Sequence, residues 1–472
     1  MPGRRTGRST KRKREAEESE QAAAADGVPK TKKSGAVLPG HRGDGNFYIG
    51  FVKVGQGDCI IVSTPAGKSI LIDCGVEPRG KEIAKGTGKE TQKQEDERLE
   101  KEHWKPIRDT LTSVLFLGGS KRIDHLILTH PDQDHHNLLS SVLPHLQFTY
   151  TNKGRRSTAD RAQNDLYRVG EVYHSTTISH KKWETRKTRE WLQKCVPNRA
   201  NVKEVTLVDT ARKFHPWGGT EGNIPANLLV ASNSGTASAL KILEEPNCKI
   251  YLLVSNLKDQ GDYNRARSAD DTHPPALTDN DTKEGFNRKS IVTLIEVFGK
   301  KIMLCADATI RTEEYLCRHF SLHIGNLDLM QVPHHGSAVT SLNHPKFIEM
   351  VKPKNVVICT GKEVTKDRLP GYQTIISYLS EQATGAGGKH KLFCWNNPAR
   401  DPAVPQALRP KIGNFRSPEP SFVGNYTTKQ VGHTPAPHAE FEVDRGLWTT
   451  GSNGTQRFMI DKDDRKLVRI PS

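Results

Sequence analysis

The chain has 472 residues, of which 34% are hydrophobic and 26% charged, and its formal net charge is +16. So low an apolar share indicates one folded core with loop-rich additions rather than two complete cores. No apolar stretch approaches the roughly 20 residues that span a bilayer, and the polar N-terminus shows no apolar signal segment. We therefore expect a soluble, cytoplasmic protein without membrane insertion, although the basic cluster Lys11-Arg12-Lys13-Arg14 would also suit a nuclear one. The positive charge favours polyanionic partners, of which nucleic acid is the commonest.

The first 45 residues combine basic clusters with very few large apolar side chains, so we expect residues 1–45 to form a disordered tail. Order begins with three apolar runs, and strands are expected over 47–54, 59–64 and 69–74, separated by glycine-containing turns. The eight cysteines are scattered and form no CxxC pair. That distribution fits buried thiols better than a disulfide framework or a cysteine zinc site.

Strands alternate with helices along the rest of the chain, which predicts a layered α/β architecture. Further strands are expected over 125–129, 251–255, 290–298, 301–305, 327–332 and 355–360, and helices from about 137 and over 181–194, 312–320, 343–351 and 371–382. We expect residues 46–384 to form one domain. Residues 385–472 are rich in proline and glycine, and we expect this extension to pack short strands, near 391–395, 440–443 and 457–460, onto the same domain.

Four metal-competent side chains lie within six residues: His130, Asp132, Asp134 and His135. They directly follow the strand expected over 125–129. In extended backbone, side chains two residues apart point the same way, so His130 and Asp132 should face one side. Gathering imidazoles and carboxylates is costly unless a cation offsets their charges. A lone histidine or aspartate would be uninformative, but the cluster predicts a metal site.

Two more polar clusters follow expected strands in the same way. Asp307 comes just after the strand over 301–305, and His334-His335-Gly336-Ser337 follows the strand over 327–332. Each alone is weak evidence, because aspartate and serine often cap helices and paired histidines occur on surfaces. Three clusters with one strand-then-turn topology favour a single metal centre.

These residues carry a family resemblance. The run 130–135 resembles the metallo-β-lactamase motif HxHxDH with its second histidine replaced by aspartate. Together with the GQGD turn at 55–58, the LIDCG run at 71–75, the Asn287…Ser290 approach to a strand and the HHGS run at 334–337, it resembles the ComEC-type subfamily of DNA-internalisation proteins. The resemblance, to a free-standing soluble form, implies an αββα sandwich with a metal site at one edge of its sheets. It also implies a nuclease or phosphodiesterase activity, most of all on DNA.

Carried over residue by residue, the resemblance implies a ligand set for two ions. His130 and Asp132 would bind one ion and Asp134 and His135 the other, with Asp307 bridging both.

Further roles come from the same comparison. His174 stands where the fold often supplies a third ligand to the first ion, and Asp73 resembles an aspartate that supports the site from behind by hydrogen bonding. The family often has a His-Pro pair where this chain reads Leu369-Pro370. His335 or a water would then have to complete the second site, which would otherwise be weak or empty.

The mixture of imidazoles and carboxylates suits Zn²⁺ or Mn²⁺, as one or two ions. The implied reaction is attack on phosphorus by a metal-activated hydroxide, with Asp134 in the catalytic set. His334 or His335 would protonate the leaving oxygen or stabilise the charge on it, and Ser337 would either hold a phosphate oxygen or cap a helix.

Alternatives remain open at this point. The same fold hosts other hydrolases, such as lactonases, thioesterases and phosphocholine esterases, and a degenerate member would bind nucleic acid or a protein partner without catalysis. The basic stretches 153–156 and 181–189 could follow a phosphate backbone. Trp183 and Trp191 could stack on bases, although we favour a surface helix that tryptophan anchors to the core.

Overall fold

The residues that the computed structural model describes are 40–77, 104–120, 122–143, 149–150, 156–157, 167–175, 188, 191, 202–204, 229–231, 238–257, 286–337, 345–361, 369–382, 387–395 and 438–471. All of them belong to one unit, residues 39–472. The tail expected over 1–45 lies outside the described residues except for 40–45. The helix expected over 181–194 lies outside them except for Thr188 and Trp191.

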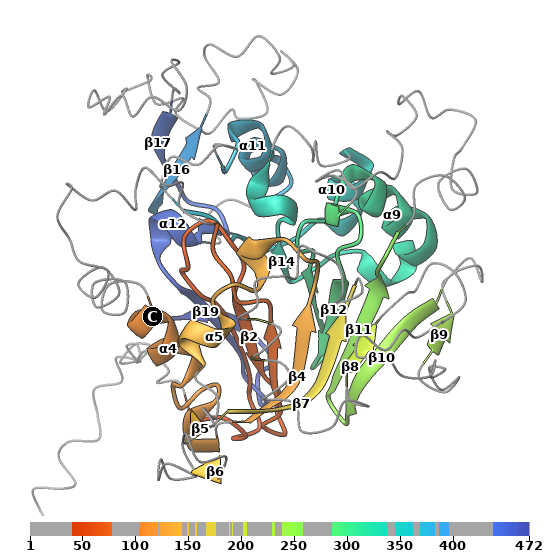
Figure 1. Cartoon of the computed structure of the whole chain (residues 1–472). Coiled ribbons are helices and arrows are strands. Elements are labelled where there is room, and N and C mark those ends of the chain that lie inside the picture. Colours follow the sequence, from red (N-terminus) through yellow and green to blue (C-terminus); the bar gives the residue numbers. More distant parts are fainter. Residues whose placement is uncertain are drawn as a thin grey trace, which may run out of the picture. The chain divides into compact units, whose positions relative to one another are not determined.

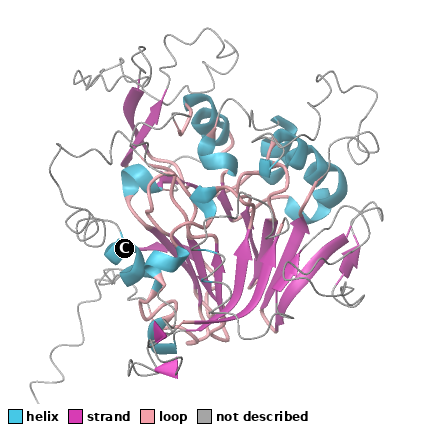
Figure 2. Ribbon diagram, in the orientation of Figure 1, coloured by secondary structure: helices cyan, strands magenta, loops and turns pink. Residues whose placement is uncertain are grey.

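Two eight-stranded sheets organise this unit (Figure 1 and Figure 2). In spatial order the first sheet contains β20 (Leu467–Ile470), β19 (Gln456–Ile460), β1 (Phe47–Phe51), β2 (Ile60–Ser63), β3 (Ser69–Ile72), β4 (Arg122–Leu128), β7 (Arg168–His174) and β8 (Val202–Glu204). The second contains β18 (Leu447–Thr449), β15 (Val356–Ile358), β14 (Leu329–Gln331), β13 (Lys300–Leu304), β12 (Val292–Val297), β11 (Cys248–Val254), β10 (Ser238–Glu245) and β9 (Leu229–Ala231). Two strand pairs, β5 (Thr149–Tyr150) with β6 (Arg156–Ser157) and β16 (His390–Trp395) with β17 (His438–Val443), form separate two-stranded sheets.

The described helices are α4 (Lys105–Leu111), α5 (Leu139–Val142), α9 (Ile310–Ile324), α10 (Pro345–Val351), α11 (Tyr372–Ser380) and α12 (Thr450–Asn453). The longest of them, α9, has 15 residues. Among the helices of the described residues there is no candidate for a membrane-spanning segment.

Helices and sheets stack in four layers. The apolar core between the sheets takes Ile49 from the first sheet and Ile295 from the second. A second core packs α9, through Leu316, and α10 and α11 against the second sheet, and a third packs α4, through Leu111, and α5 against the first sheet. In Figure 1, α4 and α5 accordingly lie on the opposite side of the sheets from α9 and α10. The αββα sandwich implied by the resemblance is confirmed.

Burial on both sides explains why the strands read as apolar runs rather than as alternating patterns. All five residues of β1 and all four of β2 are buried, because each sheet has the other sheet on one face and helices on its other face. The strands expected over 47–54, 59–64 and 69–74 end up as β1, β2 and β3, shortened at their turns. Downstream, the helix expected from 137 begins at Leu139 and follows a 3-10 turn over Gln133–His135.

Parallel pairing brings the ends of several strands to the same edges. In the first sheet β3, β4 and β7 are parallel neighbours, and in the second sheet β13, β14 and β15 are. The carboxyl ends of parallel neighbours lie together, and there open sheets commonly place ligands. All of the sequence clusters described above follow strands of these two sets.

Candidate metal centre

The polar clusters predicted from the sequence leave the carboxyl ends of β4, β13 and β14. His130 comes two residues after β4, Asp307 three residues after β13, and His335 four residues after β14. The backbone at His334 and His335 is left-handed, with φ of 49° and 52°. Non-glycine residues seldom adopt that conformation, and it is held here by the surrounding structure, which is typical of functional turns.

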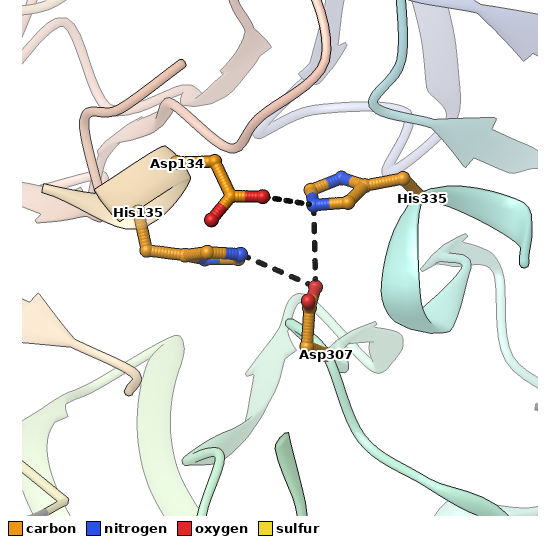
Figure 3. Close-up of side chains that lie close together, drawn as sticks. All are labelled: Asp134, His135, Asp307 and His335. Atoms are coloured by element: carbon orange, nitrogen blue, oxygen red, sulfur yellow. Dashed lines mark ion pairs between the residues drawn. The ribbon is translucent and has the colours of Figure 1, made fainter. Parts of the chain in front are cut away.

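Four side chains from these turns form a tight group: Asp134, His135, Asp307 and His335. One ligand atom from each lies within 4.8 Å of the others. Figure 3 shows Asp134 and His135 approaching from one side and Asp307 and His335 from the other. Asp307 Oδ1 is 3.2 Å from His135 Nε2 and 3.4 Å from His335 Nε2, and Asp134 Oδ2 is 3.4 Å from His335 Nε2.

The second oxygen of Asp307 faces a different set of side chains. Asp307 Oδ2 is 3.7 Å from His130 Nε2 and 3.6 Å from His334 Nε2, and His130 Nε2 is 4.0 Å from Asp132 Oδ2. The rings of His130 and His135 have centroids 4.0 Å apart. Asp307 therefore lies between two groups of nitrogen and oxygen atoms, the arrangement that a bridging carboxylate requires.

The donor set fits a bound cation. His130 Nε2, His135 Nε2, His335 Nε2 and Asp307 Oδ1 are all buried, and none makes a hydrogen bond within the described part of the chain. Leaving a buried polar atom unsatisfied costs about 1–3 kcal/mol, so four such atoms in one place need an explanation. A divalent cation among imidazole nitrogens and carboxylate oxygens supplies it.

The far side of each ring is fixed by a hydrogen bond. His135 Nδ1 donates to Asp73 Oδ2 over 2.7 Å, and His335 Nδ1 donates to the carbonyl of Cys359 over 2.8 Å. Asp73 also accepts from the backbone N–H and the hydroxyl of Thr129, at 2.8 and 2.5 Å. A ring that donates through Nδ1 turns the lone pair of Nε2 toward the centre, as metal ligation requires.

The charges in this centre shift several pKa values. Burial lowers the pKa of His335, but the carboxylates of Asp307 and its neighbours outweigh burial and raise it to about 10. Burial and the adjacent His135 lower the pKa of His130 to about 4. Although burial opposes ionisation of Asp307 as well, the surrounding histidines hold its pKa well below the usual range. Without a cation, protonated imidazoles neutralise the carboxylates.

The structure also describes three other residues that the sequence analysis considered, His174, Ser337 and Leu369. His174 ends β7 and pairs in register with Leu128 of β4, so its backbone reaches the same sheet edge, and its side chain is buried. Ser337 follows the double-histidine turn, and its backbone N–H donates to the carbonyl of His334 over 2.8 Å. That N–H is therefore engaged within the turn. The carbonyl of Leu369 accepts from the hydroxyl of Thr360 over 3.2 Å, and Thr360 follows Cys359, whose carbonyl accepts from His335.

Trp191 is fully buried and donates to the carbonyl of Leu143 over 2.6 Å. The expectation that tryptophan anchors this segment to the core is confirmed for Trp191, which leaves its ring unable to stack on bases. Trp183 lies outside the described residues.

Three polar residues at the centre were not singled out from the sequence as members of the site. Asp58 is buried, with Oδ1 3.6 Å from His335 Nδ1, and Gln331 donates to its other oxygen over 3.0 Å. Asn287 Nδ2 lies 3.3 Å from His334 Nε2. In the sequence, Asp58 and Asn287 counted only as parts of the GQGD turn and of the Asn287…Ser290 approach, and Gln331 only as part of a strand, so none was assigned a role in the site.

No protein-family model and no curated protein sequence matches the chain. Among solved structures, human tRNase Z, short form, aligns with 66% of this chain and 91% of its own, at 13% identity and a TM-score of 0.31. A diphosphatase from the PhnP family aligns with 66% of this chain and 85% of its own, at 13% identity and a TM-score of 0.26. The metallo-β-lactamase fold protein YhfI from Bacillus subtilis aligns with 66% of this chain and 85% of its own, at 10% identity and a TM-score of 0.25. Likenesses at this level assign the chain neither a family nor a reaction.

Proposed function

We propose that the chain is a metal-dependent hydrolase of the metallo-β-lactamase fold that cleaves phosphodiester bonds in DNA or another nucleic acid. One observation carries the proposal: three imidazole nitrogens and one carboxylate oxygen, all buried and without hydrogen bonds in the described part of the chain, converge where three strands end. Such a set is costly as structure alone and suits one or two Zn²⁺ or Mn²⁺ ions.

The proposed ligands divide into two groups that share Asp307. Asp134, His135 and His335 would hold one ion. His130 and Asp132, with His174 as a third candidate, would hold the other. In this assignment His335 takes the place of the histidine that is missing at Leu369.

When bound, such ions lower the pKa of water and polarise a phosphoryl oxygen. The chain itself orients the rings, through Asp73 and the carbonyl of Cys359, so that Nε2 faces the centre. His334 is the partly exposed histidine of the double-histidine turn, with 16% of its side chain accessible, and it is our candidate for passing a proton to the leaving oxygen. Ser337, one turn on, would contact a phosphate oxygen through its hydroxyl.

The net charge of +16 supports a polyanionic substrate. If the substrate is nucleic acid, its binding should weaken steeply as salt increases, because binding releases counterions from the phosphates. An uncharged ester would show no such dependence.

The deciding experiment is an assay of the full chain with Mn²⁺ or Zn²⁺ on single- and double-stranded DNA, RNA, a cyclic nucleotide and an ester. We expect metal-dependent cleavage of a nucleic acid and loss of that activity in the Asp134→Ala variant. Cleavage of the ester alone would replace the proposal with another hydrolase class. If the purified chain neither contains nor binds metal, the proposal is wrong and a non-catalytic binding role takes its place.

A further inference from the structure

Asp58 and Gln331 form a hydrogen-bonded pair directly behind the metal centre. Asp58 belongs to the turn between β1 and β2 in the first sheet, and Gln331 is the last residue of β14 in the second. Gln331 Nε2 donates to Asp58 Oδ2 over 3.0 Å, and the two side chains are 0% and 1% exposed. The bond therefore connects the two sheets at the edge where the proposed ligands meet.

The glutamine end of the pair holds the segment that leads to Asp307. Gln331 Oε1 accepts from the backbone N–H of Cys305 over 2.7 Å and from that of Ala306 over 2.8 Å. Ala306 has a φ of 47°, a left-handed conformation that alanine rarely adopts. One carboxamide thus satisfies two buried backbone donors and supports the bend that directs Asp307 inward.

The aspartate end holds the segment that carries Asp134 and His135. The backbone N–H of Asp58 donates to the carbonyl of Asp134 over 3.1 Å, and the carbonyl of Asp58 accepts from Gly75 over 3.0 Å. The Asp58 carboxylate also faces two of the proposed ligands from behind. Its Oδ1 is 3.6 Å from His335 Nδ1 and its Oδ2 is 3.9 Å from His135 Nδ1.

We propose that the Asp58–Gln331 pair is the positioning element of the metal centre: it fixes the distance between the ligands of the first sheet, Asp134 and His135, and those of the second, Asp307 and His335. The inference rests on the proposed function, in that the centre binds a cation. In this assignment Asp58 and Gln331 act through the segments and rings that they contact, and the nitrogen of His135 that faces Asp58, Nδ1, already donates to Asp73. The pair determines how tightly the cation is held.

The first test replaces the carboxamide without changing its size. Gln331→Met keeps the volume but removes the acceptor for two backbone N–H groups and the donor to Asp58. Gln382→Met is the matched control, because Gln382 is a buried glutamine whose Nε2 donates to the carbonyls of Lys354 and Gly446, at 3.5 and 3.0 Å, away from the centre. Affinities for Mn²⁺ and Zn²⁺ are measured by calorimetry on the full chain, and the visible spectrum of the Co²⁺-loaded chain reports ligand geometry.

We expect Gln331→Met to weaken cation binding about tenfold or more, as loss of outer partners of metal ligands commonly does, and to change the Co²⁺ spectrum. Gln382→Met should leave affinity and spectrum unchanged, even where it lowers the unfolding temperature. If the parent chain binds a cation tightly and Gln331→Met binds it equally well, this inference alone is overturned. A parent chain that binds neither cation overturns both this inference and the proposed function.

A second pair of variants separates positioning from general damage. Gln331→Glu places a carboxylate against the carboxylate of Asp58, so that two acceptors face each other, and it should also weaken binding about tenfold. Combining Asp58→Asn with Gln331→Glu exchanges donor and acceptor and restores the bond between the sheets, so we expect much of the lost affinity to return. A double variant that binds no better than Gln331→Glu alone would contradict the assigned role.

Discussion

Replacing Asp73 with asparagine exchanges one oxygen for an NH₂ group at the back of the centre. Asp73 Oδ1 can continue to accept from the backbone N–H of Thr129, now at 2.8 Å. The new NH₂ takes the place of Oδ2, which accepts from His135 Nδ1 over 2.7 Å. Two donors then face each other. His135 relieves the conflict only by moving its proton to Nε2, the nitrogen that would have to face the cation.

The expected magnitude follows from that single contact. A hydrogen bond to a charged group contributes about 1.5–3 kcal/mol, so Asp73→Asn should lower the stability of the metal-free chain by roughly that amount. Metal affinity should fall about 10- to 100-fold, because the ring no longer has its lone pair at Nε2 without an added cost. The hydroxyl of Thr129 can rotate to accept from the new amide, so we expect no further loss there.

Calorimetric titration with Mn²⁺ and Zn²⁺ measures the affinity, and urea unfolding in the presence of a chelator measures the stability. Asp124→Asn is the matched control. Asp124 is a buried aspartate near the start of β4, at the opposite end of the strand from His130. Asp124 accepts from the backbone N–H of Ser69 and pairs with Arg42. The control should lose stability but not affinity. If Asp73→Asn binds the cation as tightly as the parent chain, the tautomer argument is refuted.

Three further outcomes are expected. The pKa of His335 lies at about 10 in the metal-free chain, so at pH 7.5 its imidazole is protonated and a cation must displace that proton. Apparent affinity should therefore rise between pH 7 and 9, and binding enthalpies in Tris and HEPES should differ; equal enthalpies would contradict this. A Cβ on Gly75 would meet the carbonyl carbon of Asp134 at 2.3 Å, whereas one on Gly119 meets nothing within 4 Å. Gly75→Ala should therefore lose metal affinity and Gly119→Ala should not, and an unaffected Gly75→Ala would show that the turn tolerates displacement. Removing a cation present at about 1,000 times its dissociation constant should cost about 4 kcal/mol and lower the melting temperature by roughly 5 °C, and an unchanged melting temperature would argue against a specific site.

The sequence predicts this cluster of side chains well where its members follow strands. Apolar runs such as β4 and β13 end in histidine or aspartate, and the parallel order of strands then brings those residues together. His335 was expected either to complete the second site or to act on the leaving oxygen, and the structure places it against Asp134 and Asp307. Its exact place depends on a left-handed backbone that spacing does not reveal.

What the sequence does not predict is set by tertiary contacts. β10 has the sequence SALKILEE, rich in residues that favour helices, and it forms a strand because it pairs with β9 and β11. Asp58 and Gln331 lie 273 residues apart and meet only after the two sheets pack. Local propensity contains no information about such a pair.

The strands contributed by residues 447–460 have a consequence for biosynthesis. β18 extends the second sheet beside β15, and β19 pairs with β1 in the first, with Phe47 opposite Ile460. The first sheet thus gains an inner strand, β19, and the second an edge strand, β18. Both come from a segment that is translated some 400 residues after β1, as the pairing of Phe47 with Ile460 illustrates. A nascent chain that has already exposed every proposed ligand still lacks these strands, and pairings so distant in sequence form slowly. If the centre binds a cation as proposed, binding should therefore follow the synthesis of these strands rather than precede it.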